Sequence, residues 1–346
     1  MLANRSPKTS GPRAGFTLIE LLVVIALIGI LAGLLVPAVV GRGMRRVRLA
    51  SVRMEISQLE SAIARFRGNY NMDPPSSITL YETEAGWNSD PKSKALVRQM
   101  WPQFNFANTS LDINGDGDFT DTETNPADPV ALPNPITLTQ GECLVFFLGG
   151  INGNTVPGSA SADNNIPLQI GACTGFSKDP ANPFARGGNR EAPLFDFLPA
   201  RFSDLDADGF PEYLDPLPNQ TKPYLYYSVY DGTAYQSAEF FAASLSDPDQ
   251  TGSADRTRTG LSEPYRTGTA LAAPLWKPNS YQIISPGYDK AYGFGGAYLP
   301  SGTDRLDFDA TFYTGATPAS LVPPTGDQRM RESDNITNFS PAELQP

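Results

Sequence analysis

The sequence of 346 residues contains no histidine. Without histidine the chain lacks the usual general base of enzymes, the Ser/His/Asp and Cys/His nucleophile arrangements, and histidine metal sites. This absence excludes most familiar enzyme classes, and we expect a protein that is not an enzyme. A hydrolase using paired carboxylates such as Asp204 and Glu212 is left as an alternative by residue type alone.

Cysteine is also scarce, because Cys143 and Cys173 are the only two. Both lie in the region that we place outside the cytoplasm, where a disulfide can persist. The sequence does not report the distance between them. A Cys143–Cys173 disulfide and two buried free thiols are therefore alternatives.

Basic residues become scarce beyond residue 53. Residues 1–53 hold eight Lys or Arg and one acid, whereas the rest of the chain carries 18 basic and 36 acidic residues. Nucleic-acid binding depends on neutralising phosphates with basic side chains, so we expect no DNA or RNA partner. An excess of carboxylates is compatible with divalent cations. The 31 glycines and 32 prolines predict a body rich in turns and loops.

One long apolar run lies near the N-terminus. A basic leader, residues 1–15, precedes it, and no charged or strongly polar side chain occurs from Leu21 to Val40. As a helix, this run is about 30 Å long, which matches the hydrocarbon core of a bilayer. The small residue Gly15 precedes the run instead of following it, unlike the cleavage site of an ordinary secretory signal. The hydrophobic segment is therefore expected to survive processing.

The residues from Gly15 to Glu20, GFTLIE, and the apolar run behind them closely resemble the signature of the type IV prepilin and pseudopilin family. By this resemblance, a prepilin peptidase cleaves between Gly15 and Phe16, and the new amine of Phe16 is methylated. A lone carboxylate in an apolar span costs about 2.5–3.5 kcal/mol. The family provides a partner for Glu20 in the terminal amine of a neighbouring subunit. Pro37 is expected to kink or locally melt the helix and so permit close packing in a filament.

Five arginines follow the apolar run and form what we call the arginine collar: Arg42, Arg45, Arg46, Arg48 and Arg53. Under the positive-inside rule such a collar favours the cytoplasm, which conflicts with an exported body. We nevertheless expect a single-pass inner-membrane protein with its head outside the cytoplasm, which then enters a periplasmic or surface filament. A plain membrane anchor, with Glu20 at the interface, is the alternative.

An apolar stripe at intervals of three and four residues continues the helix beyond the membrane: Leu49, Val52, Ile56, Leu59, Ile63 and Phe66. One helix from Phe16 to about Arg67 is predicted, and strands are predicted at Cys143–Leu148, Tyr224–Tyr230 and Tyr281–Ser285. The expected fold class is α+β, with a long N-terminal helix, half transmembrane and half amphipathic, packed on a small antiparallel sheet with long loops. The expected domains are the leader 1–15, the hydrophobic helix 16–41, the amphipathic continuation and turn 42–75, and a calcium-binding head 76–346.

Two acidic loops have the ligand spacing of EF-hand calcium loops. Residues 112–123, DINGDGDFTDTE, predict Asp112, Asn114, Asp116, Asp118, Thr120 and Glu123 as ligands, with Gly117 at the sharp turn. Residues 204–215, DLDADGFPEYLD, predict Asp204, Asp206, Asp208, Phe210, Glu212 and Asp215, with Asp215 in place of the usual final Glu. Calcium suits such dense oxygen loops better than magnesium, which retains its waters. The alternative at both positions is a solvated acidic turn.

Two further segments resemble the major pseudopilin of type II secretion: the helix end at Ile56–Pro75, and the last hairpin at Tyr281–Gly296 with Glu332–Phe339. In that hairpin a calcium ion pins a loop, which makes Asp289 and Asp334 candidate ligands of a third site. A solvated turn is the alternative there.

The resemblance implies a structural subunit of a type II secretion pseudopilus. Such a subunit assembles with copies of itself and related pilins, with prepilin peptidase, the secretion-system assembly platform and the membrane as its partners. A type IV pilus subunit with an adhesive or ligand-binding head is the alternative function.

Overall fold

The computed structural model describes residues 17–115, 119, 135–153, 171–204, 209–230, 235, 264–268, 273–293, 295–299 and 331–344, without the side chains of residues 32–43. The chain divides into two compact units, Met1–Ala50 and Ser51–Pro346. The boundary falls inside the first helix, α1 (Leu18–Tyr70).

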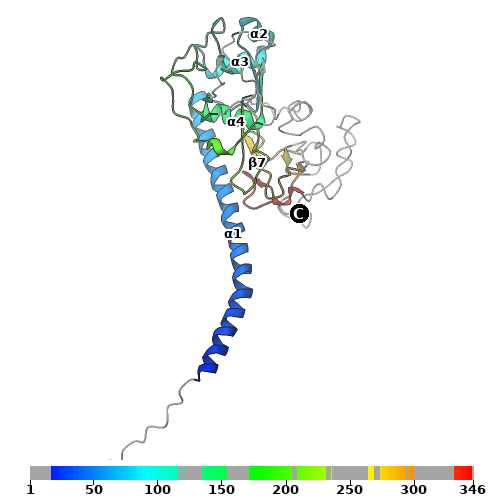
Figure 1. Ribbon diagram of the computed structural model, residues 1–346. Helices are drawn as coiled ribbons and strands as arrows, with labels where there is room; N and C mark the ends of the chain where they lie inside the picture. The colour runs from blue at the N-terminus through cyan, green and yellow to red at the C-terminus, as the bar shows by residue number, and fades with distance from the viewer. Residues whose placement is uncertain are drawn as a thin grey trace, which may run out of the picture. The chain divides into compact units, whose positions relative to one another are not determined.

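The first unit contains the N-terminal part of α1 (Figure 1). The large apolar side chains from Leu18 to Leu31 are all exposed, from 46% for Val24 to 82% for Leu18. The helix continues through Pro37 without interruption, so the local melting considered for that position is not observed. Within the described residues, no helix combines the length and the apolar character needed to cross a bilayer.

The second unit begins with the amphipathic part of α1, and the predicted apolar stripe is its buried face. Val52, Leu59, Ile63 and Phe66 are fully buried, and the ring of Phe66 packs edge-to-face on Phe147. The helix ends at Tyr70, three residues beyond the predicted end at Arg67. The stripe is therefore core, as the sequence predicts.

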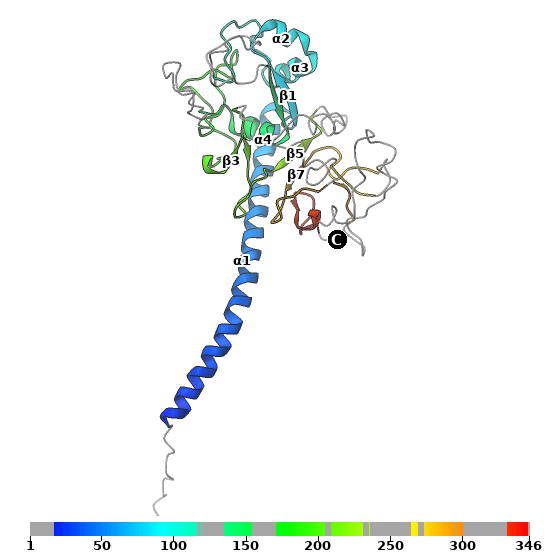
Figure 2. The same cartoon turned by 45° about the vertical axis from the view of Figure 1, so that its right-hand side comes forward.

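Among the described residues of the second unit, short strands pair in four small sheets (Figures 1 and 2). The largest is antiparallel, in the order β5 (Leu225–Ser228), β7 (Tyr281–Ser285), β9 (Ile336–Thr337). Leu225 pairs with Ile284, and Ile284 with Thr337. The remaining pairs are antiparallel β1 (Ser77–Leu80) with β2 (Ile136–Thr139), antiparallel β3 (Phe202–Ser203) with β4 (Glu212–Tyr213), and parallel β6 (Tyr265–Arg266) with β8 (Gly296–Ala297). The predicted strands at Tyr224–Tyr230 and Tyr281–Ser285 correspond to β5 and β7.

The predicted strand at Cys143–Leu148 is wrong, because these residues form the middle of α4 (Gln140–Gly149). All ten residues of α4 are buried. The sequence of a helix that is buried on every side has no amphipathic periodicity, so periodicity cannot distinguish it from a buried strand. The capping box of Thr139 and Glu142 is the sequence signal that indicates a helix here. The Thr139 amide donates to the Glu142 carboxylate at 2.6 Å. The helix packs against β4 and β5.

The described residues form four further helical segments: α2 (Glu84–Ser89), α3 (Pro91–Met100), and the 3-10 turns at Pro199–Arg201 and Arg331–Asp334. An aromatic cluster joins α2 to loops that follow α3. The ring of Trp87 packs edge-to-face on Phe104, and Phe104 on Phe184.

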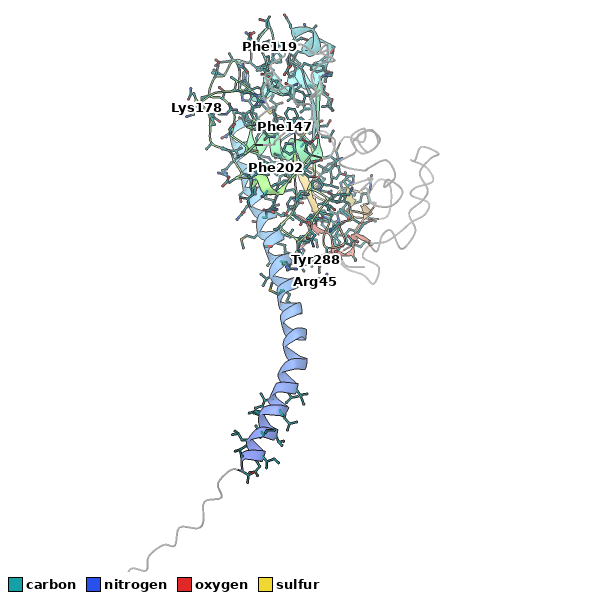
Figure 3. All side chains as sticks on the ribbon, viewed as in Figure 1. Arg45, Phe119, Phe147, Lys178, Phe202 and Tyr288 are labelled. Atoms are coloured by element: carbon teal, nitrogen blue, oxygen red, sulfur yellow. The ribbon has the colours of Figure 1, made fainter. Side chains whose placement is uncertain are left out.

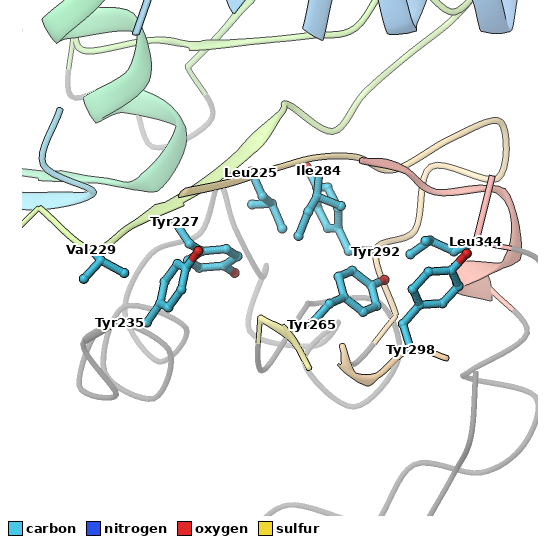
Figure 4. Packing of buried hydrophobic residues seen from close by; sticks show 9 residues of the cluster. All are labelled: Leu225, Tyr227, Val229, Tyr235, Tyr265, Ile284, Tyr292, Tyr298 and Leu344. Carbon is cyan, nitrogen blue, oxygen red and sulfur yellow. The ribbon is translucent and has the colours of Figure 1, made fainter. Parts of the chain in front are cut away.

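A second core, rich in tyrosine, lies beside β5 and β7 (Figure 4). Its members come from segments far apart in the sequence: Leu225, Tyr227, Val229, Tyr235, Tyr265, Ile284, Tyr292, Tyr298 and Leu344. Tyrosine hydroxyls in such a core need partners. The Tyr292 hydroxyl donates to the Pro223 carbonyl, and that of Tyr235 to the Lys277 carbonyl at 2.9 Å.

An ion pair fixes α1 to the 3-10 turn before β3. The Arg201 guanidinium donates two hydrogen bonds to the two carboxylate oxygens of Glu55, both at 2.6 Å, and lies 4.3 Å from the centroid of the Tyr213 ring. The Tyr224 hydroxyl donates to the same carboxylate at 2.8 Å. The side chains of Arg201 and Glu55 are only 20% and 12% exposed, so the pair is largely removed from water.

In the structure both cysteines are free thiols, with Cys143 buried and Cys173 partly buried. Cys143 lies in the first turn of α4, whereas Cys173 lies beside Gly149 at the other end of that helix and donates to the Asn152 side chain at 3.1 Å. Six residues of helix separate Cys143 from Gly149, about 9 Å, which exceeds the span of a disulfide.

Cys173 is expected to react slowly with alkylating agents in the folded protein. Burial, together with the charge of Asp196, raises the pKa of the Cys173 thiol to about 12. At pH 8 its thiolate fraction is then roughly a thousandfold below that of an ordinary thiol, and alkylation should accelerate as the pH approaches 12. Mass spectrometry after iodoacetamide treatment measures this rate, with urea-unfolded protein as the control. Unfolded protein that takes up no label without a reductant would contradict the free thiols.

Candidate functional site

A capping box begins α1, in the residues that match the prepilin signature. Thr17 precedes the first turn, and both its amide and its hydroxyl donate to one oxygen of the Glu20 carboxylate, each at 2.9 Å. The Glu20 amide in turn donates to the Thr17 hydroxyl at 3.3 Å. This reciprocal arrangement satisfies amides that a helix leaves without partners at its start. The sequence pattern Thr-x-x-Glu predicts this capping box. Thr17 was nevertheless not among the residues to which the sequence analysis gave a role.

The other residues of the signature are described only in part. Gly15 and Phe16, the predicted cleavage site, lie outside the described residues, as does the side chain of Pro37. Glu20 is exposed and is followed by exposed apolar side chains. The structure therefore presents a carboxylate at the beginning of an apolar helix, with its own Thr17 as a hydrogen-bond partner.

The first predicted calcium loop is described from Asp112 to Gly115. The Asp112 carboxylate accepts the Gly115 amide at 2.5 Å, and Asn114 is buried. Glu82, which the sequence analysis did not single out, is also buried, and its carboxylate accepts the Ile113 amide at 2.6 Å. Arg186 donates to the Ile113 carbonyl at 3.3 Å. The remaining predicted ligands, Asp116, Asp118, Thr120 and Glu123, lie outside the described residues.

The second predicted loop is described at its two ends. The Asp204 carboxylate accepts the Gly209 amide at 3.2 Å, and Gly209 has a φ of 88°, the left-handed conformation that a sharp turn requires. Asp206 and Asp208 lie outside the described residues. Phe210 and Glu212 are buried, with Glu212 in β4.

Asp215, the last predicted ligand of this loop, has protein partners. Its carboxylate accepts the Leu217 amide at 2.9 Å, a side-chain N–H of Gln220 at 2.9 Å, and the Ser285 hydroxyl at 2.5 Å. Burial raises the pKa of Asp215, although the hydrogen bond from Ser285 opposes the rise. Asp215 thus links the loop to β7.

The predicted third site brings Asp289 and Asp334 together although 45 residues separate them. One Asp334 oxygen accepts the amides of Tyr288 and Asp289, at 2.6 and 3.1 Å. The turn before them needs glycine, because Gly287 has a φ of 72° and a Cβ there would meet Asp334. Among the described residues the other oxygen of Asp334 is buried without a hydrogen-bond partner. Burial and the charge of Glu343 raise the pKa of Asp334, against the two amides, which lower it.

No three carboxylate or cysteine side chains converge as metal ligands within the described part of the chain. The described residues of each loop show local turns held by carboxylate-to-amide hydrogen bonds. Such turns are common to calcium loops and to solvated acidic turns.

The prokaryotic N-terminal methylation motif matches residues 11–36. This match supports the type IV pilin and pseudopilin family. Members of that family are structural filament subunits that prepilin peptidase processes and that start from a membrane anchor. The matched motif covers the leader junction and the start of α1, including Thr17 and Glu20. No curated protein and no solved structure matches the chain.

Proposed function

We propose that this chain is a pseudopilin, a structural subunit of a type II secretion pseudopilus. The observation that carries the proposal is the methylation motif placed at the start of a helix whose apolar side chains are all exposed over its first turns. An apolar surface of this extent needs a cover. The membrane covers it before assembly, and the helices of neighbouring subunits cover it in the filament.

The second unit supports a mechanical role. Its polar contacts join distant segments, as in the pairing of Glu55 with Arg201 and of Asp289 with Asp334. The helix end and the last hairpin favour a pseudopilin through their resemblance to the major pseudopilin. A type IV pilus subunit with an adhesive or ligand-binding head is the second candidate.

The proposed processing is tested by the mass and the N-terminal residue of the chain produced with a prepilin peptidase. The expected product begins at Phe16 and carries a methyl group on its amine. A Gly15→Val variant is the matched control, and it should keep its leader because a bulky side chain replaces the small residue at the junction. An uncleaved wild-type chain would contradict the proposal and leave a membrane-anchored protein, whereas cleavage after Val40 would contradict it by removing the anchor.

We further propose that calcium rigidifies the head, with the loop at 112–123 as the principal site. The ligand spacing supports this site, and Glu82 and Asp112 already hold its first turn. A second ion at 204–215 requires Asp215 to exchange its bonds with Gln220 and Ser285 for the metal. A third ion next to Asp334 would bind the carboxylate oxygen that has no hydrogen-bond partner among the described residues.

Calcium is expected to stabilise the folded chain. At a free concentration about 100 times its dissociation constant, one ion raises the free energy of unfolding by about 2.7 kcal/mol, and a chelator removes this gain. Thermal unfolding with calcium, with magnesium and with a chelator measures the effect. Glu123→Gln should abolish most of the calcium-dependent shift, whereas the matched variant Asp196→Asn, an exposed acid outside both loops, should retain it. Equal unfolding curves with calcium and with chelator would refute a calcium-stabilised head.

A further inference from the structure

An open cleft lies beside the C-terminal end of α1 in the second unit, with a volume of about 370 Å³. This volume is sufficient for a small molecule or for a side chain of a partner. Three aromatic rings line it in edge-to-face contact, with centroid distances of 5.6 Å from Tyr70 to Trp101 and 5.0 Å from Trp101 to Phe176. Asp179 and Glu191 are exposed along the same cleft. The cleft therefore combines aromatic walls with carboxylates.

This combination recognises a cation with a flat, weakly hydrated head group. A guanidinium stacks on aromatic rings and forms paired hydrogen bonds with a carboxylate. The charge of Glu191 reaches the aromatic wall, because it adds to the burial that raises the pKa of Tyr70 to about 12. The basic residue of the lining, Lys178, lies at the outer edge of the second unit (Figure 3), where its ammonium group stays hydrated. The chemistry of the cleft thus favours arginine.

The chain itself carries a concentrated source of arginine in the arginine collar. All five basic residues between positions 42 and 53 are arginine and none is lysine. Attraction to an anionic membrane surface would not discriminate between the two, whereas stacking and paired hydrogen bonding require arginine. Arg45 and Arg46 are exposed on α1.

We propose that the cleft receives an arginine of the collar of a second copy of this chain, with Arg46 as the leading residue. The inference rests on the filament role proposed above. A contact between two different surfaces of one chain is a head-to-tail contact, which repeats from copy to copy along a filament when its rotation does not close into a ring. The collar, which conflicts with an exported body under the positive-inside rule, thereby gains a role between subunits.

Chemical cross-linking between two differently tagged full-length chains tests the contact. One chain carries Arg46→Cys and the other Glu191→Cys, and a short bismaleimide, which spans the gap left by the two shortened side chains, is added to membranes that contain both. A cross-link that joins the two tags is the expected result. Background from Cys143 and Cys173 is low, because Cys143 is buried and Cys173 is largely protonated. The absence of a cross-link between the two tags would overturn the proposal. A chain that carries both substitutions and cross-links only within itself would also overturn it.

Charge exchange provides the control. Arg46→Glu and Glu191→Arg are each expected to lower the recovery of assembled chains roughly tenfold, and their combination should restore it to within about twofold. Arg46→Glu with Asp196→Arg, which reverses an exposed acid outside the cleft lining, should not restore it. If the two double variants gave equal amounts of assembled chains, or if Glu191→Arg alone assembled normally, the cleft would be excluded as the binding site. The arginine collar would then be interpreted as a lipid-binding segment. The cross-link is also measured on chains that keep their leader. A failure of processing would then contradict the filament role, whereas the cross-link would still test the contact between the collar and the cleft.

Discussion

Glu20→Ala is expected to be processed normally and yet to be almost absent from filaments. The substitution leaves the cleavage junction intact but removes the proposed partner of the terminal amine of the next subunit. An unpaired charge in an apolar surrounding costs about 2.5–3.5 kcal/mol, which corresponds to a loss of roughly 60-fold or more in assembled subunits. Sedimentation of sheared filaments, followed by quantification of the chain in the pellet, measures the loss.

A matched variant separates pairing from helix capping. Thr17→Ala removes the hydroxyl that exchanges hydrogen bonds with Glu20 but leaves the carboxylate in place. It should cost about 1 kcal/mol of helix stability and assemble far better than Glu20→Ala. If both variants assemble equally poorly, the role of Glu20 is capping, and the proposed pairing with a neighbour is wrong.

Arg201→Ala is expected to lower the free energy of unfolding by about 3 kcal/mol. The substitution leaves the Glu55 carboxylate, 12% exposed, without its two hydrogen bonds from the guanidinium. It also removes the cation that lies over the Tyr213 ring. Urea unfolding of the full chain in detergent, followed by tyrosine and tryptophan fluorescence, measures the change.

Two controls show whether an orphaned charge causes this loss. Lys277→Ala removes a looser pair, 3.9 Å from Glu60 and more exposed on both sides, and should cost less than about 1 kcal/mol. Glu55→Leu combined with Arg201→Met removes both charges together and should be less destabilising than Arg201→Ala. A change within about 0.5 kcal/mol for Arg201→Ala would mean that the pair is only a surface contact.

Local patterns in the sequence predict much of this fold. The apolar stripe from Val52 to Phe66 is buried as expected, and β7 has its predicted bounds. The one wrong strand lies where the periodicity is uninformative, in the fully buried α4. A closer reading of Thr139 and Glu142 would have corrected it, and the same Thr-x-x-Glu pattern at Thr17 and Glu20 was missed as well.

The contacts that join distant segments could not be predicted from the sequence. Glu55 and Arg201 are 146 residues apart, and no local pattern links their charges. In the same way, the partners of Asp215 come from the loop after it and from β7, 70 residues away in the case of Ser285. Ligand spacing identifies Asp215 as a loop acid, whereas tertiary packing determines which donors its carboxylate meets. Predictions of cleavage, which depend on a continuous motif, do not have this limitation.

The pairing of β9 with β7 sets an order in time for the formation of the head. The central strand β7 obtains its second neighbour only from Ile336 and Thr337, and Leu344 is fully buried in the tyrosine-rich core. The sheet and this core therefore cannot be completed until the chain has been released as far as Leu344. A chain that is cut before Ile336 would present an open strand edge and an unfilled core to proteases. Quality control of the subunit can thus operate before any copy is offered for assembly.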